Sequence, residues 1–281
     1  MAPIPTAVQE VLDLFWFVFF CCFNVMVKSI ALALSLATFS FAAPLQANTS
    51  SWSGWKNVKH FFVFGWTSSN GPNWVGFLTT TYNASALLTY NLAYGGATVD
   101  STLVAPYAST VLSMKDQVTT EFLPTYGSAS NSTSAAAVPW TPSSSLFAFF
   151  IGINDVGNSW WLNNSTLYDA IFAEYASLLD DVYATGARNF LFLSTPPVNL
   201  APLTLSKNDS GYATENEGIV ILDWNKRLSS MVAELKERKE GVTAFVHDTW
   251  GVFNAVIEDP KAFEQTAGYK NVTAYCAAYA K

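Results

Sequence analysis

The chain has 281 residues, of which 51% are hydrophobic and 12% charged, so a sizeable core is expected and wholesale disorder is excluded. Its formal net charge of -7 argues against a nucleic-acid partner, because such a partner selects a basic surface. Most of the 10 Trp and 12 Tyr side chains are expected to fill the core.

The N-terminal part of the chain has the pattern of a leader. Met26-Val27-Lys28 is a short basic start, residues 30–41 are apolar, and small residues precede Pro44. This pattern predicts a secretory signal peptide at residues 26–43, cleaved after Ala42 or Ala43, with residues 1–25 as an over-extended start. Residues 44–281 are then one domain. A transmembrane anchor is the alternative, since residues 11–27 are also apolar.

Asn-x-Ser/Thr sequons follow the predicted leader. A signal peptide followed by this many sequons is typical of a glycosylated eukaryotic exoprotein, without a stable membrane partner once the signal is removed. The sequons begin at Asn48, Asn83, Asn131, Asn163, Asn164, Asn208 and Asn271.

The cysteines favour an incomplete sequence. Cys21 and Cys22 leave with the leader, so Cys276 is unpaired in an oxidising compartment. Either it is a buried free thiol, or its partner belongs to downstream sequence that this chain lacks.

Along the rest of the chain, short apolar runs alternate with amphipathic stretches, as in a βαβ-type fold. Residues 145–152 are the most hydrophobic run and are expected to form the central strand. Strands are predicted at residues 60–65, 89–93, 145–152, 189–195 and 242–246, and helices at residues 72–82, 112–122, 166–185, 215–239 and 252–257.

This order predicts a three-layer α/β/α sandwich with a mostly parallel, flavodoxin-like sheet, whose functional groups lie at the carboxyl ends of strands. Residues 127–138 are expected to form a flexible surface loop. No long helix follows the last predicted strand, so we expect the fold to be truncated at its C-terminus. Such truncation would leave a large apolar sheet face exposed and the protein poorly soluble.

Common nucleotide-binding, zinc and serine-elbow motifs are missing from the sequence, so neither a cofactor nor a metal is expected. Two turns after predicted strands remain as a candidate site. Residues 91–98 contain Gly95-Gly96, and residues 152–155 contain Asn154. A backbone N–H and an Asn amide that meet at one point can form an oxyanion hole, although Gly and Asn also favour ordinary turns.

These turns resemble the second and third conserved blocks of the SGNH (GDSL) hydrolases, with Gly96 and Asn154 in the glycine and asparagine positions. The amino-acid sequence of residues 65–74, 91–100 and 149–155 is similar to that of the fungal carbohydrate esterases of family 16, the acetylesterases. The resemblance runs from about residue 59 to residue 279. It implies a secreted Ser-His-Asp esterase that removes acetyl groups from short plant-wall sugars, with Gly96 and Asn154 holding the oxyanion.

The sequence departs from the family pattern at the nucleophile. The family's Gly-Asp-Ser directly follows the first strand, whereas here Gly65 runs into Trp66-Thr67-Ser68. An internal deletion that removes the Gly-Asp-Ser segment explains why Gly65 is followed directly by Trp66. By count, Thr67 takes the place of the missing serine, and neither Thr67 nor Ser68 has an evident base.

The family's C-terminal Asp-x-x-His block, which supplies the base, is also missing. His60 opens the first predicted strand, at its amino end. His247 closes the last strand beside Asp248, and neighbours in a strand point to opposite faces. Both histidines are therefore interpreted as structural.

Three interpretations follow. The first is an acetylesterase of this type whose sequence is incomplete, inactive as given. The second is a secreted sugar-binding pseudoenzyme that uses Trp66, Trp74, Trp160 and Trp161 around an inactive cleft. The third is an N-terminally anchored surface glycoprotein. The joint loss of serine, base and final helix favours the first.

Overall fold

The computed structural model describes residues 50–67, 73–127, 139–207 and 209–274. Within these residues, one five-stranded parallel sheet has the strand order β2-β1-β3-β4-β5. Strand β2 lies on one side of β1 within the sheet, and β3 lies on the other side. The direction in which strands are added therefore reverses between β1 and β3. Ligands bind at such reversal points in open α/β sheets. The strands are β1 (His60–Gly65), β2 (Leu88–Asn91), β3 (Ser145–Phe150), β4 (Asn189–Leu193) and β5 (Thr243–His247).

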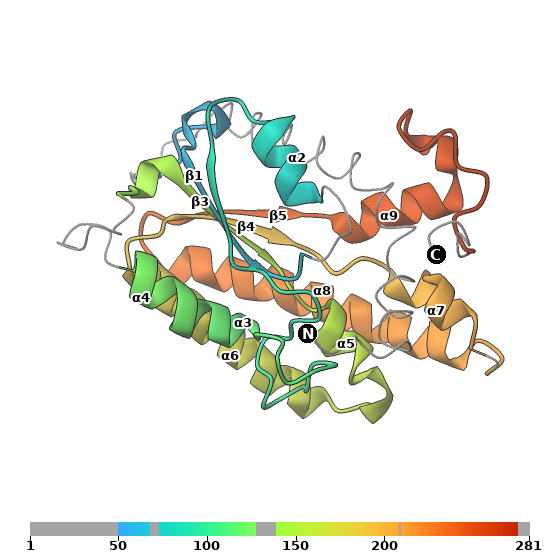
Figure 1. Ribbon diagram of the computed structural model, residues 1–281. Helices are drawn as coiled ribbons and strands as arrows, with labels where there is room; N and C mark the ends of the chain where they lie inside the picture. Colours follow the sequence, from blue (N-terminus) through green and yellow to red (C-terminus); the bar gives the residue numbers. More distant parts are fainter. Residues whose placement is uncertain (1–49, 68–72, 128–138, 208, 275–281) are drawn as a thin grey trace.

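Helices connect consecutive strands and cover both faces of the sheet, which gives three layers (Figure 1). Above the sheet lie α2 (Trp74–Thr80) and α9 (Thr249–Glu258); below it lie α3 (Met114–Asp116), α4 (Leu123–Tyr126), α6 (Ser165–Ala184) and α8 (Tyr212–Arg238). The shorter helices are α5 (Ile153–Gly157), α7 (Pro202–Leu205), η2 (Trp55–Asn57), η3 (Gln117–Phe122), η4 (Pro142–Ser144), η5 (Trp160–Leu162), η6 (Val198–Leu200) and η7 (Pro260–Ala262). The expected α/β/α sandwich is therefore confirmed.

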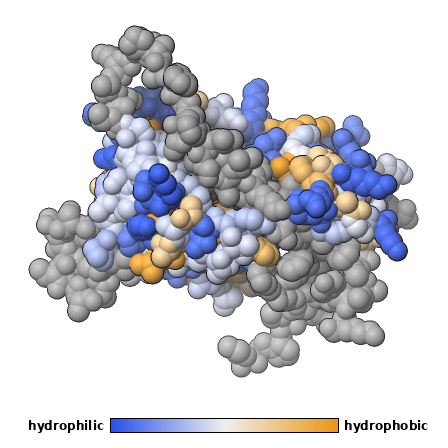
Figure 2. Space-filling view, turned by 90° about the horizontal axis from the view of Figure 1, so that it is seen from above, coloured by the Kyte–Doolittle hydropathy of each residue, from blue (hydrophilic) through white to orange (hydrophobic). Residues whose placement is uncertain are grey.

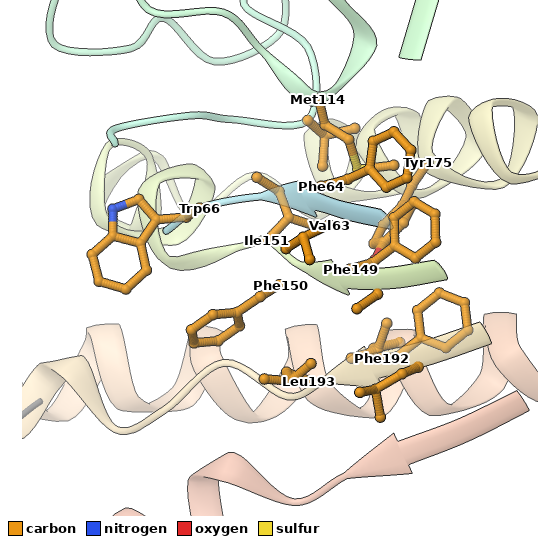
Figure 3. Packing of buried hydrophobic residues seen from close by; sticks show 14 of the residues in the cluster. Val63, Phe64, Trp66, Met114, Phe149, Phe150, Ile151, Tyr175, Phe192 and Leu193 are labelled. Carbon is orange, nitrogen blue, oxygen red and sulfur yellow. The ribbon is translucent and has the colours of Figure 1, made fainter. Parts of the chain in front are cut away.

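Aromatic rings fill the lower face of the sheet. Phe64 of β1 stacks on Phe149 of β3 with ring centroids 4.9 Å apart, and Phe149 stacks on Phe192 of β4 at 5.5 Å (Figure 3). Tyr175 of α6 lies beside Phe149. Adjacent parallel strands in register place such side chains on one face, so the apolar runs of the sequence become one continuous core.

The two long helices have the apolar stripes that the sequence predicts. In α6 the buried face includes Ile171, Leu178 and Val182, and in α8 it includes Ile221, Trp224 and Leu228. Spacings of three, four and seven residues place these side chains on one side of a helix. Both helices therefore pack against the sheet.

Some boundaries differ from the predicted ones. Helical structure predicted at residues 112–122 instead begins at Met114, because Ser113 and Asp116 form a reciprocal capping box, and it continues through the π-helical η3 into α4. Helix α8 begins at Tyr212, before the predicted residue 215. Here the Asp209 carboxylate accepts hydrogen bonds from the N–H groups of Gly211 and Ala213. The predicted loop at residues 127–138 lies almost wholly outside the described residues.

The expectation of a widely exposed sheet face is wrong for the inner strands. Leu191 and Leu193 of β4 are 2% and 1% exposed, and Phe150 of β3 is fully buried. Helices α2 and α9 lie over this face (Figure 1), and the ring of Trp52 packs on Phe245 of β5. Seen from above, hydrophobic residues form separate patches among hydrophilic ones (Figure 2).

No helix in the described part of the chain combines the length and the hydropathy needed to cross a membrane. The predicted leader lies outside the described residues, and the division of the chain into leader and single domain stays a prediction.

Candidate active site

The carboxyl end of β1, where the resemblance predicts the missing nucleophile, is held by several hydrogen bonds. The side chain of Gln117 accepts from the N–H of Gly65 at 2.7 Å and donates to its carbonyl oxygen at 3.1 Å. The N–H of Trp66 donates to the carbonyl oxygen of Phe150 on β3 at 2.6 Å. Gly65 has a φ of +97°, and a Cβ there would overlap that same carbonyl group. The chain therefore leaves β1 in a well-defined direction across the end of β3.

Gly96 lies in the turn that follows β2. It has a φ of +88°, which favours glycine, and a Cβ on it would overlap the ring of Tyr107. Tyr107 is 44% exposed. The Gly96 turn is therefore buried and packs against the ring of Tyr107, which is itself partly exposed.

Asn154 reaches this turn from the end of β3. Gly152, with a φ of +122°, redirects the chain into α5, and the Nδ2 of Asn154 donates to the carbonyl oxygen of Ala97 at 2.9 Å. An Asn amide carries two N–H groups, so one remains to donate to a ligand. The structure thus brings Asn154 against the residue next to Gly96; that the Gly96 N–H and the Asn154 amide converge on one point stays a prediction.

Asp155 fixes the same turn from inside the protein. Its side chain is fully buried, and Oδ1 accepts a hydrogen bond from the N–H of Val99 at 2.9 Å. Burial, partly offset by that bond, raises the pKa of Asp155 to about 7. The neighbouring side chains of Asn154 and Asp155 therefore bond to the main chain of residues 97 and 99, and these two bonds fix the position of the Gly96 turn.

Thr67 lies at the end of β1, as expected by count, and its hydroxyl contacts the carboxamide of Asn91 on β2. The Nδ2 of Asn91 donates to the Thr67 oxygen at 3.1 Å. An amide is not a base that could take the hydroxyl proton. Ser68 lies outside the described residues.

The two histidines have the positions that the sequence indicates. His60 opens β1 at the far end of the sheet, with its ring against that of Tyr90, and burial lowers its pKa. His247 closes β5, and its main-chain oxygen accepts from the N–H of Ser194. Burial lowers the pKa of His247 to about 4 despite the opposing charge of Asp248. Neither ring bonds to Thr67 in the described part of the chain.

The proposed arrangement of four tryptophans around a cleft is wrong. Trp66, Trp74 and Trp160 are at most 8% exposed and belong to the core, whereas Trp161 alone of the four is open, at 54%. Indole rings have a large apolar area, and here three of them are buried in the hydrophobic core. They cannot line a sugar cleft.

Gln117, Tyr107 and Asp155 were missed by reasoning from the sequence. Asp155 follows Asn154 directly, so that motif carried a signal for it. The other two lie in segments without a motif, and only the fold brings them to Gly65 and Gly96. Among the described residues, no group of three or more His, Cys, Asp or Glu side chains is placed to hold a metal ion.

Comparison with protein families shows where this fold and site belong. Residues 53–266 match the family described as GDSL-like Lipase/Acylhydrolase, and the chain belongs to this family. The resemblance to SGNH hydrolases is thereby confirmed at the level of the family and its fold.

Two curated relatives are similar to the chain. An acetylesterase of Thermothelomyces thermophilus is 40% identical over 197 residues, which cover 70% of this chain and 63% of the relative. A thermolabile hemolysin of Vibrio parahaemolyticus serotype O3:K6 (strain RIMD 2210633) is 25% identical over 208 residues, or 70% of this chain and 43% of the relative. The chain therefore matches less than two thirds of the length of either.

Proposed function

We propose that this protein is an acetylesterase-type member of the family whose site binds acetyl esters of short plant-wall sugars, like the fungal carbohydrate esterases of family 16, and that the chain as given does not hydrolyse them. The observation that carries the proposal is the contact between the Asn154 amide and the turn of Gly96, 2.9 Å from Nδ2 to the Ala97 oxygen. The similarity to an acetylesterase supports the choice of ester.

In this proposal the acetyl carbonyl oxygen accepts hydrogen bonds from the Gly96 N–H and from the free N–H of Asn154. Such donors stabilise the negative charge that develops on this oxygen when a nucleophile attacks the carbonyl carbon. In a serine-type mechanism a hydroxyl attacks while a base takes its proton. The Thr67 hydroxyl contacts the Asn91 amide instead, so the ester binds without turnover.

Binding and turnover are tested separately. Binding of acetylated xylo-oligosaccharides is measured by saturation-transfer NMR, and we expect it to be lost in Asn154→Ala. Asn158→Ala is the matched control, because Asn158 follows the same helix and also donates to a main-chain oxygen, that of Ala105 at 3.2 Å. Absence of binding to the unaltered protein, or equal binding by both variants, would refute the proposed function.

For turnover, we expect no hydrolysis of p-nitrophenyl acetate above the background of buffer. The measurement is made on the unaltered protein and on Thr67→Ala and Ser68→Ala. Turnover that either substitution abolishes would show that this chain has a working nucleophile, and the proposed inactivity would be wrong.

We also propose that the protein is secreted, with its signal peptide cleaved after Ala42 or Ala43, on the basis of the sequence pattern of residues 26–43. N-terminal sequencing of protein from the culture medium of a fungal host should begin at Ala43 or Pro44. Retention of the uncleaved chain in the membrane fraction would support the anchored alternative instead.

A further inference from the structure

Two overlapping sequons lie side by side at the start of α6. Asn163-Asn164-Ser165 and Asn164-Ser165-Thr166 both satisfy the acceptor pattern, and both asparagines are exposed. Their Cα atoms are about 3.8 Å apart across one peptide bond. Because N-linked glycans are bulky, two of them would crowd each other at that spacing, and we expect at most one of the two sites to carry a glycan.

The surroundings of the two asparagines differ. Asn164 caps α6, and its Oδ1 accepts from the N–H of Leu167 at 3.2 Å. This bond fixes the carboxamide and leaves Nδ2, the atom that receives a glycan, without a hydrogen bond to any described residue. Asn163 instead has a left-handed backbone with a φ of 45°, a conformation that is uncommon for residues other than glycine.

Another sequon shows the opposite situation. The Nδ2 of Asn83 donates to the carbonyl oxygen of Ser85 at 3.1 Å and the residue is half-buried, so a glycan there would break a turn. Asn271, in contrast, uses its Oδ1 to accept from Thr273 and Ala274. It therefore serves as an internal reporter of entry into the secretory pathway.

An exposed apolar patch lies just before Asn164. Trp161 and Leu162 are 54% and 55% exposed, and Tyr212, whose ring also contacts Trp160, is 60% exposed. A cluster of large apolar side chains on a surface usually has an occupant. The C–H face of a pyranose ring packs well on an indole, and Trp161 lies only three residues before Asn164.

We propose that Asn164 carries an N-linked glycan whose first sugar covers Trp161, and that Asn163 stays unmodified. In this modification Nδ2 loses a proton and forms a bond to C1 of N-acetylglucosamine, while the bond from C1 to the lipid diphosphate donor breaks and the lipid diphosphate leaves. The inference requires passage through the secretory pathway and does not depend on the proposed esterase function.

Two substitutions that leave both asparagines and the helix cap in place test the site. Ser165→Ala removes only the sequon of Asn163, and Thr166→Ala removes only that of Asn164. The full chain is expressed in a fungal host and its glycopeptides are mapped by mass spectrometry. We expect the glycan on Asn164 in the unaltered protein and in Ser165→Ala, and no glycan on Asn164 in Thr166→Ala.

A glycan on Asn163 in the unaltered protein would overturn the proposal. Loss of the Asn164 glycan in Ser165→Ala would overturn it as well. The absence of a glycan from both Asn163 and Asn164 would also overturn the proposal, whether or not Asn271 is occupied. A glycan on Asn271 would then show that the chain had reached the oligosaccharide transferase.

The contact with Trp161 is tested by melting temperature. Ser165→Ala carries the glycan, and the double variant Ser165→Ala/Thr166→Ala serves as its unglycosylated reference. In a domain of this size, a single stabilising contact raises the melting temperature by about 2–4 °C. We expect the glycan to raise the melting temperature by this amount when residue 161 is Trp, and not to raise it after Trp161→Ala. An equal rise with Trp161 and with Ala at this position would refute the stacking.

Discussion

Single residues at the carboxyl edge of the sheet decide how this site is built. Gly96 allows a left-handed turn that packs against Tyr107, Asn154 reaches that turn through its amide, and Asp155 holds it from the interior. The chemistry of the site is therefore carried by backbone conformation and buried polar groups as much as by exposed side chains.

At Gly96, substitution separates backbone strain from crowding. Gly96→Ala should destabilise the protein by about 1–2 kcal/mol for the left-handed conformation and by roughly 1–3 kcal/mol more for the overlap with Tyr107. Gly211→Ala is the matched control, since Gly211 has a φ of +86° and nothing within 4 Å of a Cβ. Urea denaturation measures both. Equal losses would show that Tyr107 moves aside without cost.

The buried carboxyl of Asp155 predicts a specific dependence of stability on pH. Burial raises its folded-state pKa from 3.8 to about 7, so between these values the folded state holds a proton that the unfolded state releases. The stability that Asp155 contributes is full below about pH 3.8 and is lost as the pH rises through 7. Asp155→Asn keeps an oxygen for the Val99 N–H and cannot ionise, so its stability relative to the unaltered protein should rise over this range.

Asp100→Asn is a control for which the dependence of stability on pH should have the opposite sign. Burial acts to raise the pKa of Asp100, but hydrogen bonds from Lys115 and Thr102 outweigh it and lower the pKa. Its contribution is therefore lost as the pH falls. Denaturation curves at several pH values compare both variants with the unaltered protein. An unchanged pH profile in Asp155→Asn would show that this carboxyl is not the titrating group.

At the scale of elements, the helical run from Met114 to Tyr126 packs on β1 through aromatic rings and is also hydrogen-bonded to it by a buried side chain. Gln117 is fully buried and bonds both main-chain polar groups of Gly65. This connection joins a helix below the sheet to the carboxyl end of β1. The position of that strand end therefore depends on a residue distant in the sequence.

Gln117→Leu should be clearly destabilising, because it leaves the N–H of Gly65 without its partner; an unsatisfied buried polar group costs about 1–3 kcal/mol. Thr119→Leu, on the exposed side of the same run, should change stability by no more than about 0.5 kcal/mol. Chemical denaturation followed by circular dichroism compares the two. Similar effects would show that Gln117 acts only as helix surface.

On the scale of the whole molecule, one continuous core joins all five strands to the helices on both faces. The buried inner strands differ from the exposed face that the sequence led us to expect. A fold with one shared core should unfold as a unit.

We therefore expect a single cooperative thermal transition, with coincident midpoints by far-ultraviolet circular dichroism and by tryptophan fluorescence. The ten Trp residues report on tertiary packing, whereas circular dichroism reports on the helices and strands. Two separated midpoints, or early loss of fluorescence, would contradict the single shared core.

The sequence by itself determined the order of strands and helices, the central place of β3, the apolar faces of α6 and α8, and the pairing of Gly96 with Asn154 as a candidate site. These features depend on local periodicity, on turn-forming residues and on a motif, all of which can be read from neighbouring residues. Only the tertiary structure decided that Trp66, Trp74 and Trp160 are core residues, that Gln117 holds Gly65, and that Asp155 and Tyr107 frame the Gly96 turn. Burial and contact are properties of segments that meet after folding, and no local pattern in the chain specifies which distant partner a side chain will find.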